Sequence, residues 1–379
     1  MLKILYVVST LGPSGPTNQL YGLITHLNRD LYEPMVLTLS PDPENSRLSH
    51  FQQAGIAVES LGNGRLSGML YNRRDIAKVV SRYRPDVIHT QGFRPDGLLS
   101  GFASCCPWIA TIRNDPKWDY PMKFGKVQGT WMAWRHLRAL WLATVAACCS
   151  ATIASIFQSN YHFQNIRAVA NGVDIQKYRP MESSRRQALR QKLGLAEDTK
   201  VFLSVSSLIE RKDIGTLLRG FQLAGLEKVK LLVLGDGPQR AALESIAQST
   251  FNIEFLGNVT NVHEYLAAGD GLISASLSEG LPNSVLEAMA TGLPAVLSDI
   301  PSHREVLKAD KTLESFLFPT KNEMQLAEAL QRMAKADISQ ISACTRTLVE
   351  KNFSSEIMSR KYQNIYAECV EANGGRRGE

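Results

Sequence analysis

Short apolar runs alternate with amphipathic stretches along the first half of the chain. The apolar runs predict buried strands of a parallel sheet, and the stretches with helical spacing between them predict helices on both faces. Strands are expected at residues 3–8, 35–39, 86–90, 108–112, 151–156 and 166–170, with helices such as 17–28 and 75–83 between them. The first half is therefore expected to form an α/β domain.

The second half repeats this pattern from a new apolar run at residues 200–206. Further strands are expected at 231–234, 255–259, 271–275 and 295–297, and helices at 322–334, 338–351 and 356–371, before a disordered tail at 374–378. A length of 379 residues is too long for one ordinary core, so two domains are expected. The turn-forming residues Asn171, Gly172 and Asp174 mark a hinge between them.

Residues 278–294 predict a loop that runs into a short helix, directly after the apolar run at 271–275. Pro282 followed by Asn283 or Ser284 as a cap is a start signal, and Gly292 with Pro294 is a stop signal. Such a loop lies at the carboxyl edge of a parallel sheet, where open α/β folds bind ligands. Free backbone N–H groups and the helix N-terminus would hold an anion such as a diphosphate there.

Two carboxylates flank this loop. Ser284 and Glu287 have the spacing of a capping box, so Glu287 also has a structural interpretation without chemistry. Glu279 lies on the loop outside the helix and has no such structural duty.

Glu279 and Glu287, with Gly280, Leu281 and Pro282 between them, resemble the Glu-x7-Glu motif of family 4 glycosyltransferases. The resemblance implies an α/β protein of the GT-B fold, in which two Rossmann-like parallel-sheet domains face a cleft, and a retaining reaction. It implies that Glu279 contacts the donor sugar near its reacting carbon, that Glu287 binds the nucleotide ribose, and that residues 280–284, which include Asn283 and Ser284, bind the donor. The implied domains are residues 1–175 on the acceptor side, with a helix at 355–373 that crosses back to them, and residues 176–354 for the nucleotide sugar.

Further segments of the second half resemble the donor site of this family. Lys212 matches the lysine of a phosphate-binding Arg-x4-Lys motif, whereas Ser207 stands at the arginine position and Arg211 is the candidate to compensate. A lysine at a helix start is unfavourable unless an anion lies there, although Asp213 as a cap weakens this argument. The resemblance also implies donor contacts from Gly235 and Gly237 in a Gly-Asp-Gly-Pro turn, which a plain Asp-Gly turn explains equally, and from the backbone of Gly257, Asn258 and Val259.

The first half resembles the family less closely. Its first turn lacks the Gly-x-Gly-x-x-Gly fingerprint of NAD enzymes. The resemblance places Gly15 of this turn near the donor phosphates and the acceptor, whereas a plain turn with Thr17 as N-cap explains the same residues.

Two side chains at predicted strand ends are candidates for the site. His89 resembles a cleft histidine of the family, but a lone histidine at a strand end also fits a structural role. Arg113 stands where many relatives have a donor-contacting histidine. It can instead bind an anionic acceptor, or pair with Asp115 or Asp119.

Basic charge is concentrated in the first half. Residues 1–180 contain 19 Lys and Arg against 11 Asp and Glu, a net charge of +8, and the rest of the chain contains 23 against 25, a net charge of −2. Trp131, Trp134 and Trp141 lie among basic residues between 123 and 138, before an almost wholly apolar stretch at 140–149. This pattern is typical of a helix in the interface of an anionic membrane, and also fits an ordinary long helix packed on the sheet.

Several classes of protein and site are excluded. No zinc-finger spacing or arginine-rich tract accompanies the basic charge, so nucleic acid is not an expected partner. The six cysteines lack a CxxC spacing, which predicts reduced thiols and no metal site. The apolar start stops at Gly12 without a cleavage site, and no apolar run reaches the roughly 18 residues that span a bilayer, so we expect a cytoplasmic protein that contacts the inner face of the membrane peripherally.

The favoured hypothesis is a retaining glycosyltransferase that moves a sugar from a nucleoside diphosphate sugar to an acceptor held by the basic first domain. Family habit suggests a lipid-linked saccharide of bacterial surface-polysaccharide synthesis as the acceptor. Lys212 and Arg211 would stabilise the leaving diphosphate, and the chain lacks any Asp-x-Asp motif, so neither a metal nor a cofactor is expected. Two alternatives are a nucleotide-sugar epimerase of the same fold and a non-catalytic nucleotide-binding subunit, the latter favoured by the departures at Ser207 and Arg113.

Overall fold

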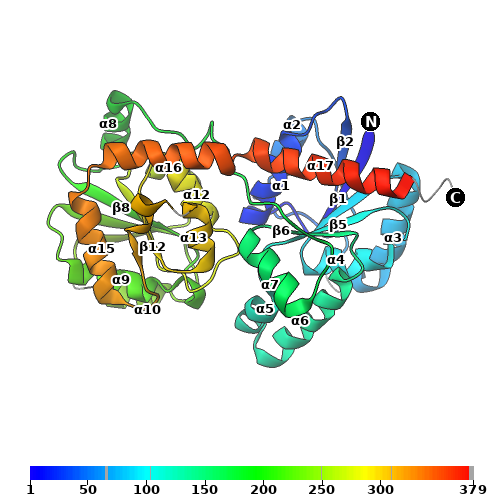
Figure 1. Ribbon diagram of the computed structural model, residues 1–379, viewed down its shortest axis with the longest axis horizontal. Helices are drawn as coiled ribbons and strands as arrows, with labels where there is room; N and C mark the ends of the chain where they lie inside the picture. The colour runs from blue at the N-terminus through cyan, green and yellow to red at the C-terminus, as the bar shows by residue number, and fades with distance from the viewer. Residues whose placement is uncertain (65–66, 103, 249, 309, 375–379) are drawn as a thin grey trace. The chain divides into compact units, whose positions relative to one another are not determined.

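The computed structural model describes residues 1–64, 67–102, 104–248, 250–308 and 310–374. These residues form two compact units (Figure 1). Unit 1 contains Met1–Gly172 and the C-terminal segment from Ser355, and unit 2 contains Val173–Ser354. Of the tail expected at 374–378, Gly374 ends the last helix and the rest lies outside the described residues.

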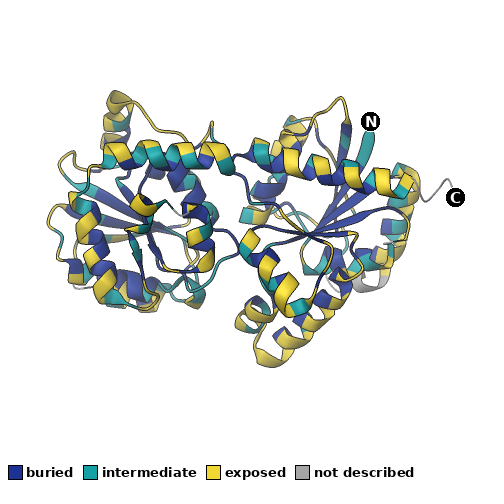
Figure 2. Cartoon of the chain, in the orientation of Figure 1, coloured by how far each residue is buried: buried dark blue, intermediate teal, exposed yellow. Residues whose placement is uncertain are grey.

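Unit 1 is built on a parallel sheet with the strand order β3-β2-β1-β4-β5-β6-β7. The strands are β1 (Leu2–Val8), β2 (Tyr32–Thr38), β3 (Ala57–Ser60), β4 (Val87–Gln91), β5 (Trp108–Ile112), β6 (Val145–Cys148) and β7 (Ile166–Ala168). In the central register, Leu5 of β1 lies between Met35 of β2 and Ile88 of β4. Both faces of such a sheet are covered by helices, which is why the strands are nearly continuous apolar runs (dark blue in Figure 2). The helices are α1 (Gly15–Thr25), α2 (Leu48–Gln53), α3 (Ser67–Tyr83), α4 (Phe93–Leu99), α5 (Pro116–Phe124), α6 (Lys126–Leu140), α7 (Ala151–Tyr161) and α17 (Ser355–Gly374).

Unit 2 repeats the architecture with the strand order β10-β9-β8-β11-β12-β13. Its strands are β8 (Lys200–Val205), β9 (Val229–Leu234), β10 (Ile253–Gly257), β11 (Gly271–Ser274), β12 (Ala295–Ser298) and β13 (Leu317–Phe318). Its helices are α8 (Ser183–Lys192), α9 (Ile214–Ala224), α10 (Arg240–Ala247), α11 (Val262–Ala268), α12 (Asn283–Ala290), α13 (Pro301–Leu307), α14 (Lys311–Glu314), α15 (Glu323–Lys335) and α16 (Ile338–Asn352). The expected fold class, two parallel-sheet α/β domains, is confirmed.

The sequence-based assignment was wrong in three places of unit 1. Residues 151–156, expected as a strand, begin α7, because the Ser150 side chain accepts a hydrogen bond from the Ile153 amide and caps a helix. The apolar stretch at 140–149, expected to continue a long helix, contains β6, whose place between β5 and β7 requires apolar residues on both faces. The N-cap of α1 is Ser14 instead of Thr17, whose amide donates to the Ser14 hydroxyl.

The C-terminal helix α17 completes unit 1 (red in Figure 1). It packs on α1 and β4, and it buries Met358, Tyr362, Ile365 and Tyr366 at helical spacing. Figure 2 shows this helix with a buried face and an exposed face. The sheet of unit 1 is therefore covered in part by a helix that lies almost the whole length of the chain away from β1.

A buried network of polar side chains joins α17 to the sheet. The Tyr366 hydroxyl lies 3.1 Å from the Tyr6 hydroxyl and 2.7 Å from Nδ1 of His89. The other ring nitrogen of His89 bonds Oγ1 of Thr111 at 2.7 Å, and that oxygen bonds the Tyr362 hydroxyl at 2.9 Å. Burial, aided by the charge of Arg113, lowers the pKa of His89 to about 3, so this imidazole is neutral at physiological pH.

The substitution Tyr366→Phe tests this network. It leaves the Tyr6 hydroxyl and a buried His89 nitrogen with one partner fewer, so we expect unit 1 to lose about 1–3 kcal/mol of unfolding free energy. All five tryptophans lie in unit 1, so urea unfolding followed by tryptophan fluorescence reports this unit. Tyr71→Phe is the control because Tyr71 is 57% exposed, and an equal effect of the two substitutions would contradict the prediction.

Candidate functional site

The candidate site of unit 2 lies where the strand order of its sheet reverses. From β8 the chain proceeds outward through β9 and β10, then returns to place β11 on the other side of β8. The loops that follow β8 and β11 therefore leave the carboxyl edge on either side of this reversal, which is the usual ligand position in open α/β sheets. One loop carries Arg211 and Lys212 on a short 3-10 turn, and the other carries Glu279.

The three charged side chains form one cluster. Oε2 of Glu279 lies 2.8 Å from Nη1 of Arg211, and Oε1 of Glu279 pairs with the ammonium group of Lys212. The side chains are only 8%, 14% and 15% exposed for Glu279, Arg211 and Lys212 respectively. Arg211 also donates to the backbone carbonyl of Ser278, and its own carbonyl accepts from the Leu277 amide at 2.8 Å. These bonds hold the two loops together.

The charge balance of the cluster is set by its burial. Burial by itself would raise the pKa of Glu279, but the charges of Lys212 and Arg211 and the hydrogen bonds that they donate outweigh it and lower this pKa to about 2. Glu279 is therefore ionised at physiological pH. Its carboxylate neutralises two cations that would otherwise face each other.

Behind Glu279 lies a polar chain that the sequence analysis missed. The Ser276 hydroxyl donates to Oε1 of Glu279 at 2.8 Å, and the Ser298 hydroxyl donates to the Ser276 carbonyl at 2.6 Å. Nδ1 of His303 lies 2.7 Å from the Ser298 carbonyl, and burial lowers the pKa of His303 to about 4. The sequence contains one signal for these residues, since Ser276 and Ser298 follow neighbouring apolar runs and parallel strands end at one edge.

The loops after β9 and β10 approach the loop after β8 closely. A Cβ atom at Gly235 would lie 1.9 Å from the Ser206 carbonyl oxygen, and one at Gly237 would lie 2.5 Å from the Leu208 carbonyl oxygen. Only glycine fits at these two positions, and Gly235 also has a positive φ of 134°. The Gly235 amide donates to the Gly257 carbonyl at 2.8 Å, so Gly257 belongs to the same layer of loops, followed by exposed Asn258 and half-buried Val259.

The N-cap of the helix after the β11 loop lies one residue before the first of its expected caps. Pro282 is the N-cap of α12 and makes no side-chain cap hydrogen bond, so the assignments of Asn283 or Ser284 as the cap and of Ser284 with Glu287 as a capping box were wrong. Gly280 and Leu281 are buried in the loop, and Glu287 is half-buried on α12. A cavity of about 10 Å³, enough for one water molecule, lies beside this helix and is lined in part by Ser284, Lys212, Ser204, Ser206, Ser274 and Ser276.

In unit 1, the expected site residues separate into two environments. His89 is 1% exposed and belongs to the buried network under α17, so its geometry favours the structural alternative. Gly15 begins α1, beside its cap Ser14. Arg113 follows β5 at the carboxyl edge and lines a cavity there.

The partners of Arg113 differ from those expected. Its guanidinium donates to the side-chain oxygens of Asn171 and Gln91, both at 2.9 Å, and burial lowers its pKa. The alternative of an ion pair with Asp115 or Asp119 was wrong, because Asp115 caps α5 and Asp119 pairs with Lys123 at 2.7 Å. Both of these side-chain partners are neutral amides, so among the residues that the structure describes no carboxylate is hydrogen-bonded to this guanidinium.

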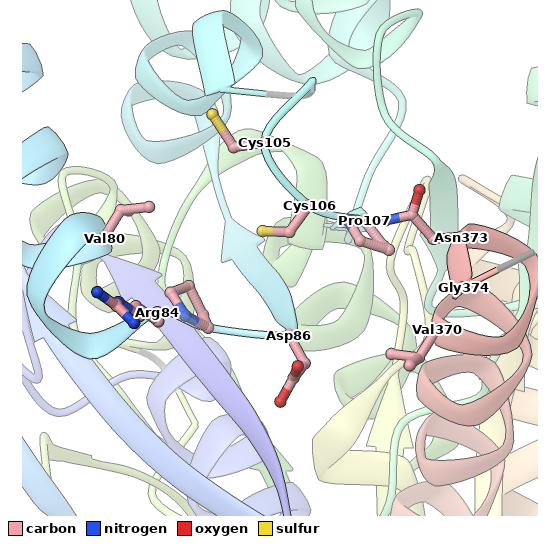
Figure 3. Close-up of a pocket in the computed structure, with 10 residues that line it drawn as sticks. Val80, Arg84, Asp86, Cys105, Cys106, Pro107, Val370, Asn373 and Gly374 are labelled. Carbon is pink, nitrogen blue, oxygen red and sulfur yellow. The ribbon is translucent and has the colours of Figure 1, made fainter. Parts of the chain in front are cut away.

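A larger cavity, of about 440 Å³, lies at the opposite edge of the same sheet. Figure 3 shows Arg84, Asp86, Cys105 and Cys106 around it, at the amino ends of β4 and β5 and beside the end of α17. Because ligands of open parallel sheets bind at the carboxyl edge, this cavity is not the candidate site despite its size.

Comparison with known proteins identifies the family. The model "Glycosyltransferase Family 4" matches residues 13–177, and the model "Glycosyl transferases group 1" matches residues 185–343. The chain belongs to the family 4 glycosyltransferases. The first matched range lies in unit 1 except for residues 173–177, which begin unit 2, and the second range lies wholly in unit 2. The fold is GT-B.

Named relatives cover most of this glycosyltransferase. It is 23% identical to the O-antigen biosynthesis glycosyltransferase WclY of Escherichia coli, over 96% of this chain and 98% of WclY. It is 27% identical to the alpha-monoglucosyldiacylglycerol synthase of Streptococcus pneumoniae, over 78% of this chain and 69% of the relative. The crystal structure of HepE from Anabaena in complex with UDP and glucose is similar with a TM-score of 0.81 and 19% identity, over 97% of this chain and 100% of HepE.

Two further properties of the glycosyltransferase concern membranes and metals. Throughout the ranges that the structure describes, no helix combines the length and the apolar character needed to cross a membrane. In the same ranges, His, Cys, Asp and Glu side chains form no group of three that could hold a metal ion.

The substitution Glu279→Gln tests the charged cluster. It leaves Arg211 and Lys212 without their shared carboxylate, so we expect unit 2 to lose about 3 kcal/mol of unfolding free energy at about pH 7. The pKa of Glu279 is lowered from an ordinary 4.5 to about 2, so the contribution of its charge is present above about pH 4.5 and is lost as the pH falls toward 2. Urea unfolding, followed by hydrogen exchange of unit 2 peptides, should show a gap between the two proteins that narrows by about 1.4 kcal/mol per pH unit below 4.5.

Glu254→Gln is the matched control, because this carboxylate pairs with Lys230 but is 47% exposed. We expect it to change stability by less than about 1 kcal/mol. A Glu279→Gln effect as small as this control, or one that stays constant down to about pH 3.5, would overturn the charge assignment.

Proposed function

We propose that this chain is a retaining glycosyltransferase that transfers a sugar from a nucleoside diphosphate sugar, bound by unit 2, to an acceptor bound by unit 1. The observation that carries the proposal is the cluster of Arg211, Lys212 and Glu279 at the point where the strand order of unit 2 reverses. Two largely buried cations, with side chains 14% and 15% exposed, beside one carboxylate suit a ligand that is anionic at one end and becomes cationic at the other. A sugar diphosphate in the transition state of transfer has this charge distribution.

The cations act on the leaving group in this mechanism. Arg211 and Lys212 stabilise the negative charge that develops on the diphosphate as the sugar departs, and their low exposure strengthens the interaction. The phosphates compete with Glu279 for these cations. Glu279 is then available to orient the sugar and to stabilise the positive charge at its reacting carbon. Because two cations supply the stabilisation, the step needs no metal.

The remaining donor contacts follow from the loops at the same edge. Glu287 holds the ribose in this proposal, and the closely packed loops that contain Gly235, Gly237 and Gly257 present backbone groups to the base. Residues 280–284 also contact the donor in this proposal. The Ser276 to His303 chain holds Glu279 in place from behind.

The family membership favours transfer over the two alternatives. An epimerase would convert the nucleotide sugar without any acceptor, so analysis of the product formed in the absence of acceptor separates it from a transferase. A non-catalytic subunit would bind the nucleotide and release it unchanged, and the buried Glu279 carboxylate beside the phosphate cations argues against this alternative.

We propose a lipid-linked saccharide of bacterial surface polysaccharide as the acceptor. WclY is named for O-antigen biosynthesis, and the streptococcal relative is named for a glucosylated diacylglycerol. We infer that the donor nucleotide is UDP, because HepE was crystallised with it, and GDP and ADP are the comparison nucleotides.

We propose that α5 and α6 bring unit 1 to the inner, anionic face of the membrane. Val127, Trp131, Trp134 and Arg138 follow one stripe of α6 and are exposed, and Trp118, Met122 and Phe124 of α5 are exposed too. The guanidinium groups of Arg135 and Arg138 lie 5.0 Å from the ring centroids of Trp131 and Trp134 respectively. We call these exposed apolar residues, with Lys117, Lys123, Lys126, Arg135 and Arg138, the basic-aromatic surface. Its composition suits a membrane interface with anionic headgroups.

Thermal unfolding with UDP, GDP or ADP, in buffer containing EDTA, tests the donor site. A nucleotide at 100 times its dissociation constant should stabilise unit 2 by about 2.7 kcal/mol. Lys212→Ala should abolish the shift because it removes a phosphate cation. Lys228→Ala is the control, since Lys228 is 73% exposed and pairs with Asp198 on the surface. The absence of a shift with every nucleotide would refute the proposed donor site.

Co-sedimentation with vesicles tests the basic-aromatic surface. The wild type should bind phosphatidylglycerol-containing vesicles and leave pure phosphatidylcholine vesicles unbound. The double substitution Arg135→Gln and Arg138→Gln should weaken binding about 30-fold, because each basic residue near an anionic surface contributes about 1 kcal/mol. The control replaces Arg185 and Lys228 of unit 2, both exposed, by Gln. Binding that does not depend on anionic lipid would refute this part of the proposal.

A further inference from the structure

Unit 1 contains a cavity that the donor chemistry does not use. It has a volume of about 190 Å³ and lies at the carboxyl ends of β4 and β5, beside the reversal of strand order between β1 and β4. Its lining includes Gln91, Arg113, Asp119, Tyr120 and His136. A concave site that combines aromatic and apolar walls with a few polar groups is typical of a small-molecule binding site.

Three side chains from three helices form a hydrogen-bonded chain that ends in this cavity. Oδ2 of Asp96 on α4 lies 2.7 Å from Nε2 of His136 on α6, and Nδ1 of His136 lies 2.7 Å from the Tyr120 hydroxyl on α5. The side chains of Asp96 and His136 are 0% and 6% exposed. The Tyr120 and His136 rings are stacked with centroids 5.7 Å apart, and Phe93 packs edge-on against both.

The backbone brings these groups together through a close helix crossing. A Cβ atom at Gly129 of α6 would lie 2.4 Å from the backbone nitrogen of Pro121 in α5. Only a glycine permits this approach, which places Tyr120 against His136. The contact between the two helices is thus established without Asp96.

Burying a carboxylate costs free energy, so a helix contact that forms without Asp96 does not by itself account for this residue. Asp96 needs its hydrogen bond to His136 to offset its burial, and its other oxygen, Oδ1, has no hydrogen-bond partner among the described residues. The arrangement is better explained as a device that orients the groups beyond the imidazole. In the tautomer in which Nε2–H of His136 donates to Asp96 and Nδ1 carries no proton, Nδ1 is the acceptor for the Tyr120 hydroxyl proton.

This arrangement determines which hydrogen bonds the Tyr120 hydroxyl oxygen can make to a ligand. Burial raises the pKa of Tyr120, so the hydroxyl keeps its proton. With this proton committed to His136, the lone pairs of the oxygen remain to accept a hydrogen bond from a ligand hydroxyl. Arg113 on the same cavity donates to the amide oxygens of Asn171 and Gln91, both neutral, and adds a cation that attracts ligand oxygens.

We propose that this cavity binds a sugar ring of the acceptor, and that Asp96 and His136 position the Tyr120 hydroxyl to accept a hydrogen bond from an acceptor hydroxyl. Sugar hydroxyls both donate and accept, so one ring can satisfy Tyr120 and Arg113 together. Asp96 and His136 are positioning residues that act through Tyr120. This inference rests on the proposed function for the identity of its ligand as the acceptor, and on the cavity itself for its preference for a sugar.

Binding of simple sugars tests the assignment directly. The probes are the methyl glycosides of glucose, galactose, N-acetylglucosamine and rhamnose, with affinities measured by saturation-transfer NMR titration against the full chain. The wild type should bind at least one probe saturably, and Tyr120→Phe should bind it about 10-fold more weakly, as expected for the loss of one buried hydrogen bond. Tyr161→Phe is the matched control, because its hydroxyl donates to Asp115 at 2.6 Å and Tyr161 does not line the cavity.

A second variant separates positioning from a structural role. Asp96→Asn should also weaken sugar binding, and its effect should disappear when Tyr120 is already Phe, because both substitutions act on the same hydroxyl. Additive effects of the two substitutions would overturn the relay. Equal sugar binding by the wild type and Tyr120→Phe, or no sugar binding by the wild type, would overturn the cavity assignment.

The affinity for UDP is measured on the same proteins. It should stay unchanged in Tyr120→Phe and Asp96→Asn, and a parallel loss of UDP and sugar binding would indicate general damage and overturn the assignment. If the wild type binds a glycoside but no nucleotide, the proposed glycosyl transfer fails while the sugar site stands. The two failures are therefore distinguishable.

Discussion

The pairing of Glu279 with Arg211 and Lys212 is the interaction on which the candidate donor site depends. It joins the loop after β8 to the loop after β11 across the point where the strand order reverses, and its members are mostly shielded from water. Exclusion of water lowers the local dielectric constant and strengthens the attraction between these charges, and it makes an unpaired charge costly. Neither the carboxylate nor the cations can therefore remain unpaired. A site held in this way has its charges in place before a donor arrives, which is the condition for electrostatic stabilisation of a transition state without reorganisation.

The surrounding structure keeps this cluster in one geometry. The glycines of the β9 loop let the backbone approach Ser206 and Leu208 too closely for any side chain, and the Ser276 to His303 chain supports Glu279 from the other side. The site is thus fixed by backbone contacts on one flank and by buried hydroxyl groups on the other. Rigid support of this kind is what a catalytic carboxylate requires.

Unit 1 uses the same sheet architecture with different chemistry at the corresponding edge. Where unit 2 places an ion cluster, unit 1 places Arg113 among amides and a chain of Asp96, His136 and Tyr120 beside a cavity. An ion cluster suits phosphates, whereas oriented hydroxyl and guanidinium groups suit the oxygens of a sugar. The difference in partners fits the division of labour between donor and acceptor that we propose.

The sequence predicted the α/β class and most strands, because apolar runs of strand length between helical stretches have few other solutions. Strand ends indicated the loop that carries Glu279, whereas Arg211, Lys212 and the glycine turns were named through the resemblance to family 4 glycosyltransferases. The sequence-based assignment failed at residues 140–156, where an apolar stretch is compatible with either a helix or a buried strand and the cap at Ser150 decides between them. The apolar pattern by itself carries no information on this choice.

Only the tertiary structure decided which side chains meet. Asp96 and His136 are 40 residues apart, and His89 and Tyr366 are 277 apart, so no spacing in the sequence predicts that the first pair lies beside a cavity and the second lies in the core. The same holds for Glu279, because no local pattern indicates its partners 67 and 68 residues away. The sequence by itself determined where strands end and which chemistry follows them. The packing of distant helices determined the burial of each group, and burial sets whether a charge is paired, shifted or available.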